Sequence, residues 1–371
     1  MDHRPLHTLR RCVAQDPGKY PPLAFSHLDQ FLAMAFAQLT FRESLRDIET
    51  CLRAQSTKLY HLGIRGRIAR SPLADANEKR PWPISRDRAL RLIAVARRLY
   101  ADEPVGVELA HTAYALDTTT IDVSWALFPW ARVGVTTGAV KLHPLLDLRG
   151  NMPTFIHISD GTLHEGHVLD QIAFEPGRFY VMDRGFLDFA RRYAMQQTHA
   201  VLVTRARSNL QYRRVYSHPV DQATGLRGDQ PIGLTGVHSG TDDPAHVRRI
   251  KSSDAEHKKL LVVLTHVFEL PALTVPQRYR CRWQVEVFFK WITPHVRLKA
   301  CFGTSENAVN TQVWIAIAVD VFVAIVKKRL HRDASLYPIL QTLSLTLFEK
   351  TPLDQLLANV ACEMDPTPNG H

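Results

Sequence analysis

The chain has 371 residues, 45% of them hydrophobic, so it is long enough to bury more than one substantial core. Its five cysteines form no CxxC pair, which argues against a zinc ribbon or a disulfide framework and favours a reducing cytosol. Neither an export signal nor a membrane span is expected, because charged residues follow Met1 and Asp320 interrupts the longest apolar run. The formal net charge of +10, spread over several arginine-rich segments, favours a long polyanion as partner.

The first hundred or so residues have the apolar spacing of helices. Apolar side chains recur along Phe31–Leu39, a capping box at Thr40–Glu43 opens a second helix, and another helix is expected after Ser85. The segment between them, Arg65–Pro83, is basic and rich in turn residues, so we expect a loop there. Residues 1–105 are therefore predicted to form a helical domain that binds DNA.

Short apolar runs that end in polar residues begin near position 112, and this pattern is typical of buried strands. Five strands are expected, at 112–116, 140–146, 152–158, 179–182 and 199–204. Helices are expected at 167–172 and 186–196, so the order is strand, strand, strand, helix, strand, helix, strand, which is the ribonuclease-H-like order. In that fold the first and fourth strands lie side by side, so Asp117 and Asp183, which follow these strands, are expected to be neighbours.

The predicted fold class is therefore α/β, with a ribonuclease-H-like catalytic core built on a mixed five-stranded sheet with helices. A helical N-terminal domain precedes the core, and a β-rich insertion interrupts it. The core is expected to occupy 106–206 and 273–335, the insertion 207–272, and a C-terminal helical segment and tail 336–371.

A helix after the insertion carries charged and aromatic residues at helical spacing. Four of them share one face, because they follow one another by three, four and four positions: Tyr279, Arg282, Glu286 and Lys290. The interleaved apolar residues are expected to supply the buried side: Trp283, Val285, Phe288 and Phe289. The polar face suits phosphate and metal, although a merely solvated face would show the same spacing.

Two aspartates and one glutamate that converge would form an oxygen-rich site for two divalent ions, and magnesium is the expected metal, with manganese as a substitute. Such a site performs phosphoryl transfer on DNA. Taken singly, either Asp117 or Asp183 could instead cap a turn or a helix. Asp122 and Asp160 are interpreted as a surface or capping residue and a turn residue, respectively.

His164 and His167 do not match the HExxH pattern of a zinc-binding helix, and a solvated or hydrogen-bonded pair is the preferred interpretation. The sequence contains neither a GxxxxGK[ST] loop nor a GxSxG elbow, so nucleotide hydrolysis and serine esterase chemistry lack support.

The pattern Tyr279-x2-Arg282-x3-Glu286 resembles the signature of the YREK subgroup of DDE transposases, those of the fourth insertion-sequence family. Further blocks similar to these enzymes are Leu116–Thr120, Gly138–His143, Asp147–Asn151, Tyr180–Phe186 and Gly303–Asn307. The N-terminal helices resemble an accessory domain of unknown function that often precedes this core. The likeness covers nearly the whole chain.

The resemblance implies that Asp117, Asp183 and Glu286 are the catalytic, metal-binding residues. The resemblance also implies that Tyr279 and Arg282 contact phosphates at the transposon end. Lys290, which shares their helical face, is expected to reach a phosphate as well, and Thr118 and Arg184 are further candidates for DNA contacts. The implied protein is a bacterial, cytoplasmic, nucleoid-associated transposase that acts as a homodimer on two kinds of double-stranded DNA, the terminal inverted repeats of its element and the target. It would cleave and join strands with Mg²⁺.

One position departs from the signature, which has a lysine seven residues beyond the glutamate. Here that position is Thr293, and the following Pro294 is expected to end the helix early. Two alternatives therefore stay open: a catalytically inactive DNA-binding copy or regulator of transposition, and a ribonuclease-H-like nuclease that cuts without joining.

Overall fold

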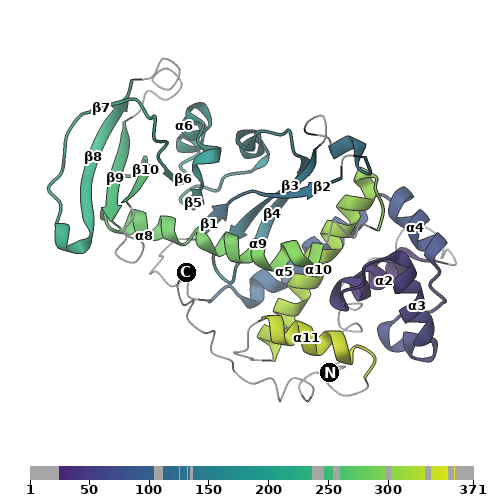
Figure 1. Cartoon of the computed structure of the whole chain (residues 1–371). Coiled ribbons are helices and arrows are strands. Elements are labelled where there is room, and N and C mark those ends of the chain that lie inside the picture. The colour runs from purple at the N-terminus through teal and green to yellow at the C-terminus, as the bar shows by residue number, and fades with distance from the viewer. Residues whose placement is uncertain are drawn as a thin grey trace. The chain divides into compact units, whose positions relative to one another are not determined.

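The computed structural model describes residues 25–103, 112–124, 126–131, 133, 137–235, 246–253, 260–296, 302–330, 336–349 and 355. The chain divides into two compact units, whose elements are labelled in Figure 1. The first unit comprises 1–101, 122–139 and 290–371, and the second comprises 102–121 and 140–289. The segment boundaries expected from the sequence stay a prediction.

The first unit is helical. Its elements are α2 (His27–Leu39), α3 (Leu45–Ala54), η1 (Ser56–Leu62), α4 (Arg70–Lys79), α5 (Pro83–Leu99), η2 (Pro129–Ala131), α10 (Glu306–Arg329) and α11 (Leu336–Thr346). The long helix α10 packs against α2, α4, α5 and α11. Asn307 near its start accepts a hydrogen bond from Trp82 N at 3.1 Å and donates to Arg80 O at 2.8 Å. The N-terminal helices therefore share one core with α10.

Helix α10 begins where the Ser305 side chain accepts a hydrogen bond from Ala308 N, and its last turn carries three cations that favour the negative helix end. The helix is long and apolar enough to cross a membrane, with a mean hydropathy of 1.9 over its central window, but that whole window is buried inside the unit. Buried core helices of soluble proteins meet the same criterion, so this is weak support for a membrane span.

The loop expected over Arg65–Pro83 is wrong in its middle, where α4 forms instead. Pro72 occupies the first turn of α4, where a helix does not need the backbone N–H that proline lacks. Pro83 likewise opens α5. Pro72 and Pro83 therefore both lie at helix starts rather than in a loop.

The second unit is built on a mixed sheet. The strands of this sheet are β1 (Ala113–Leu116), β2 (Thr119–Val123), β3 (Gly138–Asp147), β4 (Met152–Asp160), β5 (Phe179–Met182), β6 (Val201–Arg205), β7 (Tyr212–Arg214), β8 (Leu226–Leu234), β9 (Val247–Ser253) and β10 (Leu260–Thr265). Strand β3 is antiparallel to both β1 and β4, whereas β1, β5 and β6 are mutually parallel. The spatial order β4-β3-β1-β5-β6 confirms the ribonuclease-H-like core.

The β-rich insertion does not form a separate sheet. Strand β10 pairs with β6, and β9, β8 and β7 follow outward, so the insertion extends the core sheet (Figure 1). The β3–β4 hairpin closes as expected through Gly150 and Asn151, which both adopt positive φ angles, 69° and 55°. Glycine and asparagine tolerate that conformation best.

Both faces of the sheet are covered, because side chains alternate along the strands. Ala113 and Ala115 face a core completed by α8 (Thr274–Arg280) and α9 (Trp283–Val296). Tyr114 and Leu116 face the opposite core. The elements there include η3 (Glu165–Gln171), η4 (Arg184–Phe186) and α6 (Phe189–Gln197).

Two expectations about α9 are wrong. Trp283 is 58% exposed rather than buried, while Val285 is fully buried in the core under the sheet. The helix also does not end at Pro294 but continues to Val296. A proline removes one backbone hydrogen bond, and a helix near its end tolerates that loss.

Candidate active site

Asp117 and Asp183 are brought together by the parallel pairing of β1 and β5. The register pairs Leu116 with Met182, the last residue of each strand, so the two aspartates follow at the same edge of the sheet. The 65 residues between them include β2, the β3–β4 hairpin, η3 and β5. The prediction that the two strand ends are neighbours is therefore confirmed.

Asp117 lies in a largely buried position with two donors. Thr118 N donates to its Oδ1 at 2.9 Å, and Arg282 Nη1 donates to its Oδ2. Burial raises the pKa of Asp117 to about 6, although Arg282 and Thr118 act in the opposite direction. Asp183 and Glu286 raise it further through charge repulsion. The three carboxylates are thus close enough for their charges to interact.

Arg282 bridges two of these carboxylates. In addition to Asp117, it binds Glu286, with Nη2 2.6 Å from Oε1 one helical turn away. Burial alone would lower the pKa of Arg282, but the charges of Asp117, Tyr279 and Glu286 raise it. Its side chain is 17% exposed, and its Nε has no hydrogen-bond partner among the described residues. The guanidinium therefore supplies the positive charge that balances the carboxylates.

Tyr279 contacts the second aspartate. Its hydroxyl donates to Asp183 Oδ1 at 3.2 Å, and its ring is 7% exposed within the core under the sheet. Burial, followed by the charge of Asp183, raises the pKa of Tyr279 to about 12, so the hydroxyl stays a donor at neutral pH. Tyr279 thus contacts Asp183, and Arg282 contacts both Asp117 and Glu286.

Carboxylate oxygens are the ligands that hard divalent ions prefer, so the donor set of Asp117, Asp183 and Glu286 fits magnesium or manganese chemically. As the side chains stand, no three such groups among the described residues are arranged to hold one ion. Arg282 binds two of the three carboxylates instead. An ion held by Asp117 and Glu286 would take over the charge balance that Arg282 now provides.

A buried hydrogen-bond chain behind Asp117 was not anticipated. Thr118 Oγ1 lies 2.8 Å from His143 Nδ1, His143 Nε2 lies 3.0 Å from Ser159 Oγ, and the Ser159 hydroxyl donates to Asp160 O at 2.9 Å. Because the Ser159 hydroxyl donates its proton to that carbonyl, it accepts a hydrogen bond from His143 Nε2. His143 Nδ1 therefore carries no proton and accepts from the Thr118 hydroxyl. Burial lowers the pKa of His143 to about 3, so the ring is neutral. The chain fixes the residue that follows Asp117.

The remaining predicted residues lie in different surroundings. Thr118 directs its hydroxyl to His143, and Arg184 is exposed beside Asp183. Lys290 is exposed and follows Glu286 by one turn of α9. Thr293 and Pro294 fall where side chains are outside the described part of the structure.

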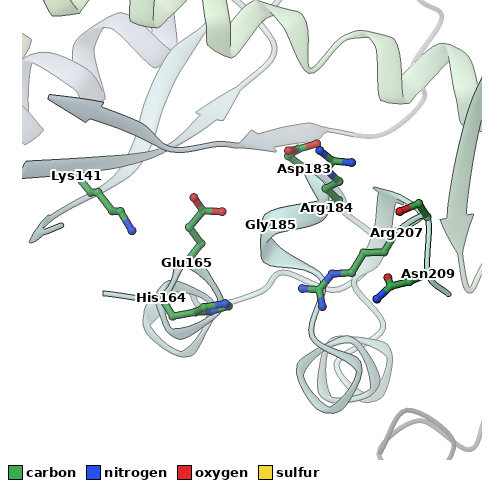
Figure 2. A pocket seen from close by; sticks show the side chains of 9 residues that line it. Lys141, His164, Glu165, Asp183, Arg184, Gly185, Arg207 and Asn209 are labelled. Carbon is green, nitrogen blue, oxygen red and sulfur yellow. The ribbon is translucent and has the colours of Figure 1, made fainter. Parts of the chain in front are cut away.

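A pocket of about 630 Å³ lies beside Asp183, which is one of the residues that line it. Its lining residues are Lys141, His164, Glu165, Asp183, Arg184, Gly185, Arg207, Ser208 and Asn209, and Figure 2 shows Glu165 and Arg207 on opposite sides of Gly185. Sequence reasoning assigned no role to Lys141, Glu165 or Arg207. Two cations and one acid that lie far apart along the chain give no local signal.

The His164/His167 pair is hydrogen-bonded, as preferred from the sequence. His164 Nδ1 accepts from Gly166 N at 3.1 Å, and His167 Nδ1 lies 3.0 Å from Arg191 Nη2. The described residues contain no metal-binding group of three at this place.

The fold and the converging carboxylates define a ribonuclease-H-like protein. Comparison of the sequence with family models finds the transposase DDE domain over residues 109–319 and a domain of unknown function, DUF4372, over residues 1–65. Because the first match spans more than half of the chain, this protein belongs to the transposase DDE domain family. Enzymes of this family cleave and transfer DNA strands.

Two relatives agree with this membership. A protein named as a transposase (y4zB) in Sinorhizobium fredii (strain NBRC 101917 / NGR234) is 27% identical over 252 residues, which are 66% of this chain and 68% of that protein. A protein named as a transposase for insertion sequence element IS5377 in Geobacillus stearothermophilus is 28% identical over 204 residues. That match covers 54% of this chain and about half, 53%, of the relative.

Among solved structures, a piggyBac transposase synaptic complex with hairpin DNA aligns over 98% of this chain and 83% of its own. The sequence identity is 10% and the TM-score is 0.44.

Proposed function

We propose that this protein is the transposase of a bacterial insertion sequence, which binds the terminal inverted repeats of its element and catalyses Mg²⁺-dependent strand cleavage and strand transfer. The observation that carries the proposal is the parallel register of β1 and β5, because it sets Asp117 beside Asp183. The contact of Arg282 with both Asp117 and Glu286 adds the third carboxylate to the same place. Family membership and the names of the relatives agree with it.

In this proposal Asp117, Asp183 and Glu286 hold two magnesium ions, or manganese in their place. When bound, such ions make water or a 3′-hydroxyl nucleophilic and stabilise the departing oxygen of the phosphodiester. Water attack on a phosphodiester would leave a 5′-phosphate and break the bond to the 3′ oxygen, which is released as a hydroxyl. That 3′-hydroxyl would then attack a target phosphodiester, form a new bond to its phosphorus and displace the 3′ oxygen of the target strand. Arg282, released from the carboxylates, and Tyr279 would donate to phosphate oxygens of the element's end.

The wider DNA contacts belong to the same proposal. Exposed Lys290 and Arg184 would bind phosphates of the DNA backbone, and Thr118 would position the backbone next to Asp117. The net charge of +10 suits double-stranded DNA, both the element's ends and the target. Two copies of the chain would hold two ends, in the cytoplasm at the nucleoid.

The proposal is tested by strand cleavage of labelled DNA that carries the element's own end, with Mg²⁺ or with EDTA. The wild type should nick at the end boundary only with Mg²⁺, and Glu286→Ala should abolish nicking while DNA binding persists. Glu349→Ala, which removes an exposed glutamate after α11, is the matched control and should cut normally. Mg²⁺-dependent cleavage by Glu286→Ala at the wild-type rate would refute the assignment.

A second candidate is a catalytically inactive DNA-binding copy or a regulator, and Thr293 favours it because the signature has a lysine there. This candidate predicts specific binding to the element's end without nicking, and a large gain of cleavage in Thr293→Lys. A nuclease that cuts without joining would instead show no preference for inverted repeats.

A further inference from the structure

A short exposed bend precedes α4 among the N-terminal helices. The chain between η1 and α4 forms neither helix nor strand, and it bends at Gly66. Ile64 and Ile68 are each 2% exposed, whereas the three residues between them, Arg65–Arg67, are exposed. The two isoleucines therefore fix both ends of the bend in the helical core, while the arginine tip, Arg65–Arg67, lies on the surface.

The fold does not require a glycine at the centre of the arginine tip. Among the described residues, a Cβ at Gly66 would meet no atom within 4 Å beyond its chain neighbours. Gly66 is also not among the glycines with a positive φ angle. A glycine in such a place costs conformational entropy on folding without a return in the folded chain. An outside surface that approaches the backbone closely would account for the missing side chain.

The guanidinium groups of the tip keep donors for a partner. Arg67 forms an ion pair with Glu49 on α3, but the distance from Nη2 to Oε1 is 3.9 Å, longer than a hydrogen bond, and the Arg67 side chain is 70% exposed. Arg65 has no hydrogen-bond or ion-pair partner among the described residues. A guanidinium always carries its charge and offers several N–H donors in one plane. Both arginines can therefore bind an anionic surface that is rich in acceptors.

Helix α3 adds two cations beside the tip. Arg46 and Arg53 are exposed, and their spacing places them on one face of the helix with Glu49 between them. The ion pair of Arg67 with Glu49 sets the arginine tip next to this face. Helices α3 and α4, which flank the tip in sequence, pack against each other (Figure 1). Arginines outnumber acids on this surface, which suits the phosphates of a nucleic acid.

The shape and chemistry of the tip fit the minor groove of duplex DNA. A single bent segment is narrower than the helix or two-stranded ribbon that enters the major groove. In the minor groove, A·T pairs show only acceptors, whereas G·C pairs add an amine that repels a guanidinium. A·T tracts also have a narrow minor groove whose strong negative potential attracts arginine. A glycine between two arginines lets the backbone come close to so narrow a groove.

We propose that the arginine tip enters the minor groove of double-stranded DNA at an A·T-rich stretch, with Arg65 and Arg67 on the base edges. Arg46 and Arg53 contact the flanking phosphates. The inference rests on the proposed function for the statement that the partner is DNA. It deepens that function, because it assigns a groove and a base composition to one surface of the N-terminal helices.

Fluorescence anisotropy of labelled duplexes with the full-length chain, in EDTA, tests the choice of groove. Three duplexes share their flanks and differ in a central tract of A·T, G·C or inosine·cytosine pairs. Inosine·cytosine has the major-groove pattern of G·C but lacks the minor-groove amine, so it resembles A·T only in the minor groove. The wild type should bind the A·T and inosine·cytosine duplexes about tenfold more tightly than the G·C duplex. Equal binding of all three, or equally weak binding of the inosine·cytosine and G·C duplexes, would overturn the proposal.

Gly66→Ala separates DNA binding from folding. The added methyl group has open space in the protein, so thermal unfolding should occur at the wild-type temperature or slightly above it. The preference for A·T should nonetheless fall from about tenfold to about threefold. Arg65→Gln combined with Arg67→Gln should abolish the preference. Arg46→Gln combined with Arg53→Gln should weaken binding of all three duplexes alike, because phosphate contacts carry no sequence information.

Arg329→Gln, which removes an exposed cation at the end of α10, is the matched control and should keep the A·T preference. Wild-type preference in the double variant of Arg65 and Arg67 would overturn the role of the tip. Wild-type preference in Gly66→Ala would overturn the close approach of its backbone.

The same proteins distinguish a failure of this inference from a failure of the proposed function. If Glu286→Ala cut the element's end normally while the tip variants lost the A·T preference, the proposed catalytic assignment would fail and the groove contact would stand. If Glu286→Ala did not cut while the tip variants kept the wild-type preference, the proposed function would stand and the groove contact would fail.

Discussion

Asp117 and Asp183 follow neighbouring parallel strands in the same way, yet their surroundings differ. Asp117 is held by Thr118 and Arg282 in a position whose burial raises its pKa to about 6. Asp183 receives one 3.2 Å hydrogen bond from Tyr279 and opens to the pocket. The difference shows that one carboxylate is positioned by the protein before any ligand binds, whereas the other is left accessible to a substrate.

The largest expected effects are losses of strand cleavage at both aspartates. Asp117→Asn and Asp183→Asn should each lower strand cleavage at least about a thousandfold, because each removes a charged ligand for divalent ions. Cleavage of labelled DNA by either variant at the wild-type rate would contradict the role given to that carboxylate.

Replacing Arg282 should give the next largest effect, on the free energy of unfolding, because Arg282 holds the Asp117 carboxylate in place. Arg282→Gln leaves Asp117 and Glu286 without their shared cation, and breaking a largely buried ion pair should cost roughly 3 kcal/mol of unfolding free energy. Added Mg²⁺ should raise the melting temperature of this variant more than that of the wild type.

Arg280→Gln is the neighbouring control, since Arg280 is exposed and its Nη2 lies 3.4 Å from Ser253 O. It should unfold like the wild type and show the wild-type response to Mg²⁺. A smaller Mg²⁺ response in Arg282→Gln than in Arg280→Gln would mean that Arg282 does not occupy the place of an ion.

The pairing of Asp117 with Asp183 could be predicted from the sequence because strand order and direction fix it. Each apolar run ends at an aspartate, and a ribonuclease-H-like order sets the two runs side by side. Helical spacing suggested a shared face for Arg282 and Glu286, and the resemblance to the family supplied their roles. The spacing assumed one helix, which is wrong, because α8 ends at Arg280 and α9 begins at Trp283. Such regular features depend on local periodicity, which a sequence shows directly.

Other features could not be predicted, because they depend on tertiary packing. The role of His143 requires the hairpin to bring Ser159 within 3.0 Å of one ring nitrogen and Thr118 within 2.8 Å of the other. The exposure of Trp283 depends on which strip of α9 meets the sheet. Proline positions in α4 are compatible with either a loop or a first helical turn.

The surroundings of Asp117 can be tested through the pH dependence of stability, because His143 contacts Thr118, the next residue in the chain. The pKa of His143 falls from 6.5 to about 3 on folding, mainly through burial, so below pH 6.5 the unfolded chain binds a proton that the folded chain does not. The stability from the neutral ring is present above pH 6.5 and is lost as the pH falls toward 3, by roughly 2 kcal/mol at pH 5.

Urea unfolding at pH 7 and pH 5 measures this loss, and His143→Gln removes the titrating ring. The wild type should lose about 2 kcal/mol more than the variant between the two pH values. His266, whose pKa burial also lowers, to about 4, is present in both proteins and cancels. The same loss in wild type and variant would show that the ring titrates normally in the folded state.

The smallest effect is expected from removing the hydrogen bond to Asp183. Tyr279→Phe keeps the buried ring and removes the hydroxyl that donates to Asp183 at 3.2 Å. Because Asp183 faces the pocket, water can replace that donor, so unfolding free energy should fall by only about 1 kcal/mol and cleavage by about fivefold. Removing Arg282, the donor to Asp117, should lower the unfolding free energy several times more. If Tyr279→Phe instead matched Arg282→Gln in both thermal unfolding and cleavage, Asp183 would be as firmly positioned as Asp117, and the two strand ends would not differ in the way their surroundings indicate.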